Sequence, residues 1–113
     1  MRIIKDKILL KELKKVSAAG FGKLVKAVVD IEKEIMAVDA ELHADQEALL
    51  LKKGSNQQNL WGINLYPDKE VENWIEFDSM INLRPSQGNL SRGVDDPKVR
   101  KKIIIIVNKL VKR

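Results

Sequence analysis

Apolar and polar residues alternate along this chain with two periods, one typical of helices and one typical of strands. In residues 8–26 apolar side chains recur every three or four positions with lysines between them, which predicts a helix that Gly20 and Gly22 weaken towards its end. Residues 44–53, ADQEALLLKK, predict a second helix, because acids precede lysines and Gly54 follows at a C-terminal capping position.

A third helix is predicted to begin at Asp96 and Pro97, an N-cap residue followed by a first-turn proline. Its apolar stripe consists of Val99, Ile103, Ile106, Val107 and Leu110. Ile104 and Ile105 widen the apolar surface beyond that stripe. We therefore expect the helix to be covered on more than one side, by a second copy of the chain in a homo-oligomer such as a homodimer.

Two β-branched runs, AVVDI at 27–31 and IMAV at 35–38, flank a charged EKE segment and predict a β-hairpin. The same region also fits a helix, since its apolar residues recur at helical spacing: Leu24, Val28, Ile31, Ile35 and Val38. Because β-branched residues concentrate in the two runs, we expect the hairpin.

Residues 59–67, NLWGINLYP, and 73–85, NWIEFDSMINLRP, are bounded by turn residues or proline and alternate as strands do, so they predict a second pair of strands. In the later strand one face would carry Ile75, Phe77, Ile81 and Leu83, and the other Glu76, Asp78, Met80, Asn82 and Arg84. A short strand is also expected at Ile3–Ile4. Together these elements predict one α+β domain over residues 1–113, a mainly antiparallel sheet of four to five strands with two hairpins, packed with three helices.

Charge changes sign twice along the chain. Residues 1–26 hold eight Lys/Arg against two Asp/Glu, residues 27–80 hold four against twelve, and residues 81–113 hold nine against two. The two basic ends could bind nucleic acid if the fold brings them together. We favour mutual neutralisation by the acidic middle instead, because no aromatic residues interleave the basic segments as base stacking requires.

Composition restricts the chemistry and the expected compartment. The chain has no cysteine, which excludes disulfides, thiolate nucleophiles and zinc knuckles. The first ten residues show no signal-peptide pattern, and the longest aliphatic run, Ile103–Val107, is far too short to span a membrane. We therefore expect a cytoplasmic protein without a membrane partner.

The only histidine, His43, lies in the stretch DAELHADQE with acids at every second position. If residues 39–47 were extended, Asp39, Glu41, His43, Asp45 and Glu47 would share one face, suited to a divalent metal or to proton transfer. A helix starting near Ala44 would disperse that row and leave acids favoured by the exposed N–H groups of its first turn. We expect the helix, with His43 and Asp45 as contributors to a ligand pocket; a metal set of His43, Asp45 and Glu47 is the alternative hypothesis.

A second group of candidates lies on the two later strands. Asn64 and Asn82 occupy strand interiors, where asparagine is unfavourable, so a shared polar pocket would explain both. The alternative, which we favour, is that both satisfy neighbouring loop backbone or that this face of the sheet is open to water. Arg84 could hold a carboxylate or phosphate. The full predicted ligand site is His43, Asp45, Trp61, Asn64, Asp78, Asn82 and Arg84, continued by polar loop residues Ser86, Gln87, Asn89 and Arg92.

Three functional hypotheses follow. The leading one is a non-catalytic binding module whose pocket takes a small anionic ligand or a metal. The others are a small metal-dependent hydrolase, with Glu47 as a base, and a nucleic-acid-binding protein that uses the basic ends. No phosphate-binding glycine motif and no serine triad is present, so nucleotide binding and serine-nucleophile catalysis are not expected.

The motifs ELHAD at 41–45, LWGINLYP at 60–67 and INLRP at 81–85 together resemble a small, uncharacterised prokaryotic family, a domain of unknown function. The resemblance extends from about residue 9 to nearly the end of the chain. It differs at Asp39-Ala40, where the family has small residues, often glycines. The resemblance implies an intracellular prokaryotic protein, and it carries over no activity, cofactor or catalytic residue.

Overall fold

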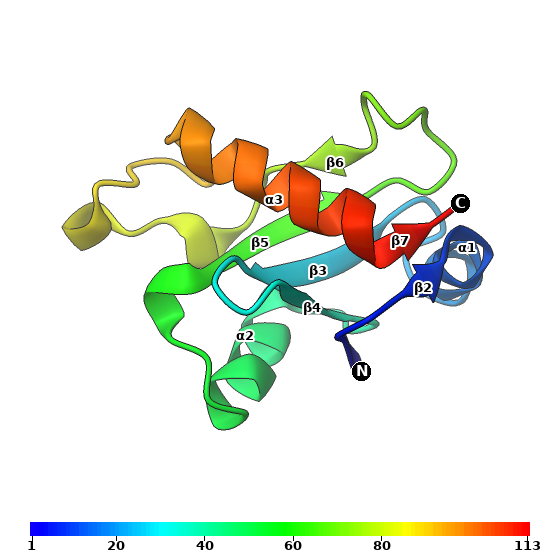
Figure 1. Ribbon diagram of the computed structural model, residues 1–113, viewed down its shortest axis with the longest axis horizontal. Helices are drawn as coiled ribbons and strands as arrows, with labels where there is room; N and C mark the ends of the chain where they lie inside the picture. Colours follow the sequence, from blue (N-terminus) through cyan, green and yellow to red (C-terminus); the bar gives the residue numbers. More distant parts are fainter.

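The computed structural model describes residues 1–113 as one α+β unit (Figure 1). Its main elements are β1 Arg2–Ile4, β2 Ile8–Leu9, α1 Leu10–Ala19, β3 Val25–Asp30, β4 Ile35–Val38, α2 His43–Lys52, β5 Leu60–Leu65, β6 Ile75–Glu76, α3 Pro97–Leu110 and β7 Val111–Lys112. Three single turns of 3-10 helix, η1 Gln57–Asn59, η2 Met80–Asn82 and η3 Pro85–Gln87, interrupt the later loops.

Five strands form an antiparallel sheet in the order β1-β4-β3-β5-β6, and β2 pairs with β7 in a separate parallel ladder. The predicted fold class, with three helices and a mainly antiparallel sheet, is thereby confirmed. The predicted short strand at Ile3–Ile4 is β1. The β2–β7 ladder was not expected, and it joins the two ends of the chain.

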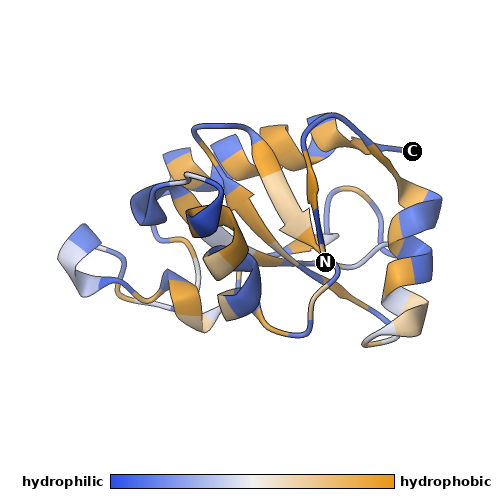
Figure 2. Cartoon of the chain, turned by 90° about the horizontal axis from the view of Figure 1, so that it is seen from below, coloured by the Kyte–Doolittle hydropathy of each residue, from blue (hydrophilic) through white to orange (hydrophobic).

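Opposite faces of the sheet are covered by different helices (Figure 2). Alternate residues of β3 and β5 point to the face covered by α3 and form a core of 18 buried residues with Met36, Trp74 and the apolar stripe of α3. The intervening residues face α2, where Val28, Ala37, Leu50 and Leu60 make a smaller apolar cluster. Since alternate side chains of a strand point to opposite faces, β3 and β5 need apolar residues on both.

The hairpin over residues 27–38 is formed by β3 and β4, with Val28 opposite Ala37. Its turn is organised by the Asp30 carboxylate, which accepts hydrogen bonds from the backbone N–H groups of Glu32 and Lys33, both at 2.9 Å. Glu34 completes the turn in the left-handed region, at φ +56°. Turn chemistry therefore selects the hairpin over the alternative helix through these residues.

The first helix is shorter than the predicted helix over residues 8–26, and this prediction was wrong at both ends. Residues 8–9 form β2, and α1 ends at Ala19, before β3 begins at Val25. The chain reverses between them because Gly22 adopts φ +88° and its carbonyl accepts a 2.8 Å hydrogen bond from the Ser17 hydroxyl. Glycine adopts such a φ without a steric penalty, which ends the helical pattern early.

The predicted strand over residues 73–85 was also wrong beyond Glu76. Only β6 pairs with β5, and residues 80–82 form the 3-10 turn η2. Its supposed single face is divided: Ile75 and Phe77 pack on the α3 side, Ile81 packs on the α2 side, and Leu83 is exposed. A 3-10 turn no longer alternates side chains between two faces, so Asp78, Asn82 and Arg84 share no strand face either.

Helix α3 begins as predicted, with the Asp96 carboxylate accepting a hydrogen bond from the Lys98 N–H at 2.9 Å. Ile103, Ile106, Val107 and Leu110 are buried as the stripe requires. Ile104 and Ile105 are 40% and 58% exposed, so the chain leaves much of their surface uncovered. No helix has the length and apolar character needed to cross a membrane.

Candidate functional site

A hollow of about 400 Å³ lies on the α2 face of the sheet, between the N-terminus of α2 and the segment that follows β6. We call it the His43 pocket. It is lined by Leu24, Lys26, Leu42, His43, Ala44, Asn64, Glu76, Asp78, Ser79, Met80, Ile81 and Arg92. Three residues of the predicted site, namely His43, Asn64 and Asp78, therefore lie together although they come from three separate parts of the sequence.

The floor of the pocket is a polar row that crosses three adjacent strands. Lys26 of β3 is paired in register with Asn64 of β5, and Asn64 is paired with Glu76 of β6. Residues that are directly opposite on neighbouring strands point to the same face and have neighbouring side chains. The sheet register therefore aligns a cation, an amide and a carboxylate beside the start of α2.

The Asn64 side chain is held in one orientation by the residues around it. Its Nδ2 donates to Glu76 Oε1 at 2.8 Å and to the Asp78 carbonyl at 3.3 Å. Its Oδ1 is buried and has no hydrogen-bond partner. The reverse orientation would aim Oδ1 at the Glu76 carboxylate, which can only accept, so the unpaired acceptor is imposed by the surroundings. An unsatisfied buried acceptor of this kind costs about 1–3 kcal/mol.

His43 is the first residue of α2 and is 8% exposed. Its Nε2 lies 2.8 Å from the Ile63 carbonyl of β5. Since a carbonyl only accepts, Nε2 carries the proton, and the neutral ring keeps Nδ1 as an acceptor. Burial lowers the pKa of His43 below 6.5, and Lys26 lowers it further, against the opposing effects of the Ile63 hydrogen bond and Asp78. The imidazole is therefore neutral at physiological pH.

One wall of the pocket is formed by Asp78 and Arg92, whose carboxylate and Nε atoms are 2.8 Å apart. Asn82, another predicted site residue, lies behind this wall and is completely buried. Its Nδ2 donates to the Arg92 carbonyl at 2.9 Å and to the Gly62 carbonyl at 2.9 Å, while its Oδ1 accepts from the Gly62 N–H at 2.8 Å. Asn82 thus positions the wall without lining the pocket.

Close approach of the wall to β5 requires the glycine at position 62. A Cβ atom there would lie 2.5 Å from the Ser79 Cβ and 2.6 Å from its Oγ. Ser79 in turn caps η2 by accepting a hydrogen bond from the Ile81 N–H. The sequence WGIN therefore places a glycine beside the pocket for steric reasons.

The rim of the pocket is apolar and open to solvent. Leu42 and Met80 are 55% and 62% exposed and face the hollow from opposite sides, one before α2 and the other in η2. Leu24 and Ile81 add partly buried apolar surface. An apolar rim offers a small organic ligand burial, and fixed polar groups beneath it would set the orientation of that ligand.

The predicted residues Arg84, Trp61 and Glu47 lie elsewhere, in what we call the Arg84 cluster. Arg84 donates to the carbonyls of Ile81 and Gln57, at 2.9 and 2.8 Å, and to that of Leu60. Its guanidinium lies 4.7 Å from the centre of the Trp61 ring and 3.9 Å from the Glu47 carboxylate. Desolvation lowers the pKa of Arg84, and Glu47 opposes that effect.

The alternating acids around His43 do not converge. Asp39 adopts φ +65°, α2 begins at His43, and Asp45 is an exposed acid of its first turn. Glu47 is turned towards Arg84. No group of three or more His, Asp or Glu side chains is placed to hold one metal ion. The geometry therefore provides no ligand set for the metal-dependent hydrolase hypothesis.

Sequence reasoning missed Lys26 and Glu76 as pocket residues. Neither residue is unusual at its position in the way that an asparagine inside a strand is, because lysine and glutamate commonly face solvent from a strand. The signal that could have found them is register, because both are paired with Asn64 across the sheet. Register depends on long-range pairing that the local pattern does not specify.

Comparison with other proteins gives one result. No curated protein and no solved structure matches the chain at a significant level. The resemblance to an uncharacterised family, carried by ELHAD, LWGINLYP and INLRP, is confirmed at the level of the family. The family model described as a protein of unknown function (DUF5674) matches residues 2–110, and the chain therefore belongs to that family.

Proposed function

We propose that this protein is a non-catalytic binding module whose His43 pocket holds a small organic anion. The observation that carries the proposal is the buried Oδ1 of Asn64, an acceptor without a partner at the floor of a hollow of about 400 Å³. This atom has almost no exposed surface in the free protein, so a ligand N–H or O–H would reach it after a small movement of the surrounding side chains, and would then offset a burial cost of about 1–3 kcal/mol.

The floor carries one cation, Lys26, and one carboxylate, Glu76, which accepts hydrogen bonds from Asn64 and Tyr66, so the cation is the group left to favour an anionic ligand. Lys26 is paired with no carboxylate within the chain; its ammonium group lies 5.1 Å from the centre of the Phe21 ring. The other cation, Arg92, is already bound to Asp78. A carboxylate of a ligand would therefore find an ammonium group that no carboxylate of the chain pairs, on the residue opposite Asn64 in the sheet.

The apolar rim favours a ligand with an aliphatic part. Leu42 and Met80 would cover it and lose their exposure to water. Methionine adapts its shape to different partners, so the rim does not demand one side-chain shape. The ligand class that fits best has an N–H donor, a carboxylate and a branched aliphatic group, as in an N-acylated apolar amino acid.

The neutral imidazole of His43 offers a ligand one hydrogen-bond acceptor. His43 Nε2 is occupied by the Ile63 carbonyl, so only Nδ1 is available to a ligand, as an acceptor. No serine, threonine or cysteine nucleophile is hydrogen-bonded to that ring, which is the arrangement that nucleophilic catalysis requires. Arg84 contributes to the fold near the pocket and is not needed to hold the anion.

N-acetyl-leucine is the probe that tests this proposal. In a titration followed by backbone amide NMR shifts, we expect shifts confined to His43, Asn64 and the η2 residues. N-acetyl-leucine amide, which lacks the carboxylate, should bind at least tenfold more weakly. Lys26→Met should have the same effect on N-acetyl-leucine, whereas the exposed Lys52→Met should have none. Shifts spread over the whole surface, or equal binding by both probes, would contradict the proposal.

A further inference from the structure

The β2–β7 ladder places the two basic ends of the chain side by side, and α3 leads directly into it. Ile8 is opposite Val111 and Leu9 is opposite Lys112 in this parallel ladder. Lys11, Lys112 and Arg113 consequently line one shallow surface hollow, although about a hundred residues separate Lys11 from the other two. Local pattern alone did not reveal this juxtaposition.

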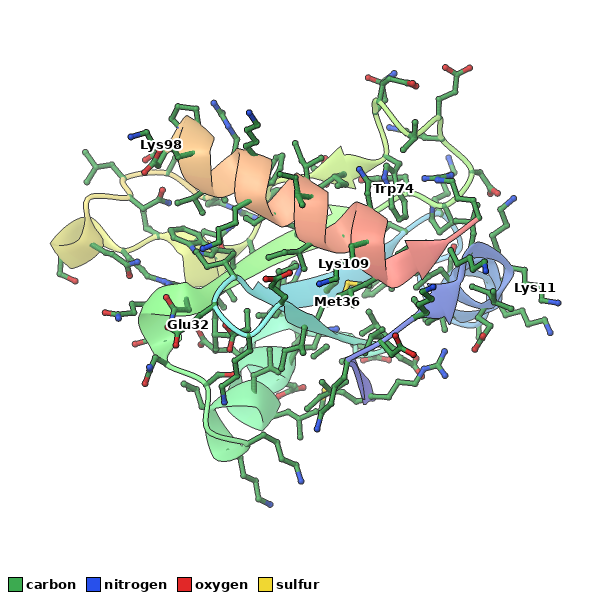
Figure 3. All side chains as sticks on the ribbon, in the orientation of Figure 1. Lys11, Glu32, Met36, Trp74, Lys98 and Lys109 are labelled. Atoms are coloured by element: carbon green, nitrogen blue, oxygen red, sulfur yellow. The ribbon has the colours of Figure 1, made fainter.

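Exposed cations continue from this hollow along the outer side of α3. Lys98, Lys102, Ile105 and Lys109 follow one another at spacings of four, three and four residues, which is one face of a helix, and Lys101 is adjacent to them. Figure 3 labels Lys98 at the start of α3, Lys109 near its end and Lys11 on α1, in that order along the long axis of the molecule. We call the set Lys11, Lys98, Lys101, Lys102, Lys109, Lys112 and Arg113 the basic ridge.

Few carboxylates neutralise the ridge. Helix α3 has no acidic residue among its 14 positions. Lys109 forms an exposed ion pair with Glu34, with its Nζ 3.0 Å from Oε1, and no other lysine of the ridge is ion-paired. The neighbouring Asp95 and Asp96 are engaged with Ser91, Leu90 and the Lys98 N–H of the helix start.

The cations in the first turns of α3 are placed unfavourably for the helix itself. Lys98 lies in the first turn of α3, with Arg100 and Lys101 close behind, while the positive end of the helix dipole lies there. Cations at that end are repelled by the unpaired N–H groups and weaken the helix slightly. A partner with negative charge along the ridge would offset this cost.

We propose that the basic ridge binds the phosphate backbone of duplex nucleic acid without reading its sequence. Fourteen helical residues span about 21 Å, the length over which a duplex presents several phosphates. No exposed aromatic ring lies among the ridge residues, and Trp74, beneath Arg113, is completely buried. Base stacking is therefore absent, which favours a duplex over a single strand. This surface is separate from the His43 pocket, since α3 and α2 cover opposite faces of the sheet.

Fluorescence anisotropy with a 25-base-pair duplex, DNA in one series and RNA in another, tests the proposal. If the ridge contacts four to six phosphates, the affinity for the bound duplex falls roughly 100- to 1000-fold between 50 and 200 mM salt. The triple variant Lys98→Gln, Lys101→Gln, Lys102→Gln should lower the affinity at least tenfold and reduce the salt slope by about three. The matched control Lys23→Gln, Lys52→Gln, Lys53→Gln removes the same charge from exposed positions outside the ridge and should leave both unchanged.

Three outcomes would overturn the proposal. The first is no binding of either duplex at 25 mM salt. The second is an equal loss of affinity in the ridge and control variants, which would trace binding to net charge alone. The third is competition by poly-glutamate at the same charge concentration as DNA, which would assign the ridge to an acidic protein. Circular dichroism spectra of both variants check that the fold is retained.

Discussion

The side-chain amide of Asn82 pairs with the backbone of Gly62 as a neighbouring strand would. Asn82 Oδ1 accepts from the Gly62 N–H at 2.8 Å, and Nδ2 donates to the Gly62 carbonyl at 2.9 Å. Strand β6 pairs with only two residues of β5, so the outer edge of β5 would otherwise be unpaired at Gly62. The Asn82 side chain therefore continues the sheet where the backbone turns away from β5. Both the oxygen and the nitrogen of its buried amide are hydrogen-bonded.

Asn82→Ala should destabilise the fold by about 3 kcal/mol, because the Gly62 and Arg92 backbone groups lose their partners while they remain buried. Urea unfolding followed by circular dichroism measures this loss. Asn56, which is exposed, provides the control, and Asn56→Ala should change stability by less than about 0.5 kcal/mol. Similar losses in both variants would contradict the strand-like role of Asn82.

Gly62→Ala should destabilise the protein by about 1–3 kcal/mol, since the new Cβ would lie 2.5 Å from the Ser79 Cβ. The double variant Gly62→Ala, Ser79→Gly removes that contact. It should recover stability relative to the sum of the two single variants, as a double-mutant cycle would measure. If the stability losses of the two single variants simply add, the new Cβ does not press on Ser79, which would mean that the pocket wall moves away from β5 at little cost.

Arg84→Lys should destabilise the protein by about 2 kcal/mol although it keeps the charge. The guanidinium donates through separate nitrogens to carbonyls of Ile81, Gln57 and Leu60, and a lysine ammonium cannot match this fork. Thermal or urea unfolding gives the difference. The exposed Arg100→Lys serves as the matched control and should be neutral within about 0.5 kcal/mol.

His43 should make the protein less stable as the pH falls below about 6.5. Burial lowers its pKa in the folded state, so between the folded pKa and 6.5 the unfolded chain binds a proton that the folded chain does not. The contribution of the neutral His43 to the free energy of unfolding is then fully present above pH 6.5. It decreases as the pH falls towards the folded pKa. Urea unfolding between pH 7.5 and 5.5 should show this decrease.

His43→Gln should remove most of that pH dependence, because glutamine does not titrate. An NMR titration of the His43 ring in the intact protein should also give a pKa below 6.5. A ring pKa above 6.5, or an unchanged pH dependence in the variant, would contradict the expected neutral imidazole.

Self-association through α3 stays a prediction. Ile104 borders a hollow of about 340 Å³ together with Val71, Ile75 and Phe77, and a second copy that covers it would bury this apolar surface. Light scattering at high protein concentration should give a mass above 12.9 kDa. Ile104→Glu should return the mass to that of the monomer, and a strict monomer in the unmodified protein would contradict the prediction.

The local sequence pattern was sufficient to predict an element where its bounds depend on residues close by in the sequence. Helix α2 begins at His43 and ends before Gly54, whose φ is +100°, close to the predicted bounds. Asp96 caps α3, and the β3–β4 hairpin turns where the charged EKE segment lies. Capping, turn chemistry and periodicity act over a few residues, so they can be predicted from a single sequence.

The end of the sheet needed the tertiary structure. NWIEFDSMINLRP alternates as a strand does, but after Glu76 it leaves β5: Ser79 caps the η2 turn, and the Asn82 side chain binds the Gly62 backbone in place of a strand. A side chain that hydrogen-bonds a strand edge in place of another strand leaves no periodic pattern in the sequence, so the local pattern does not predict it. This is also why Asn82 and Arg84, grouped with His43 from the sequence, serve the backbone instead of lining the pocket.

The sequence by itself therefore determined the fold class, most helix and strand positions and the part of the pocket that contains His43, Asn64 and Asp78. Only the tertiary structure decided that Lys26 and Glu76 join them, that Arg84 does not, and that β2 and β7 unite the basic ends. The physical reason is the same in each case. Periodicity specifies which face of an element is apolar, whereas strand register and long-range pairing specify which polar residues meet.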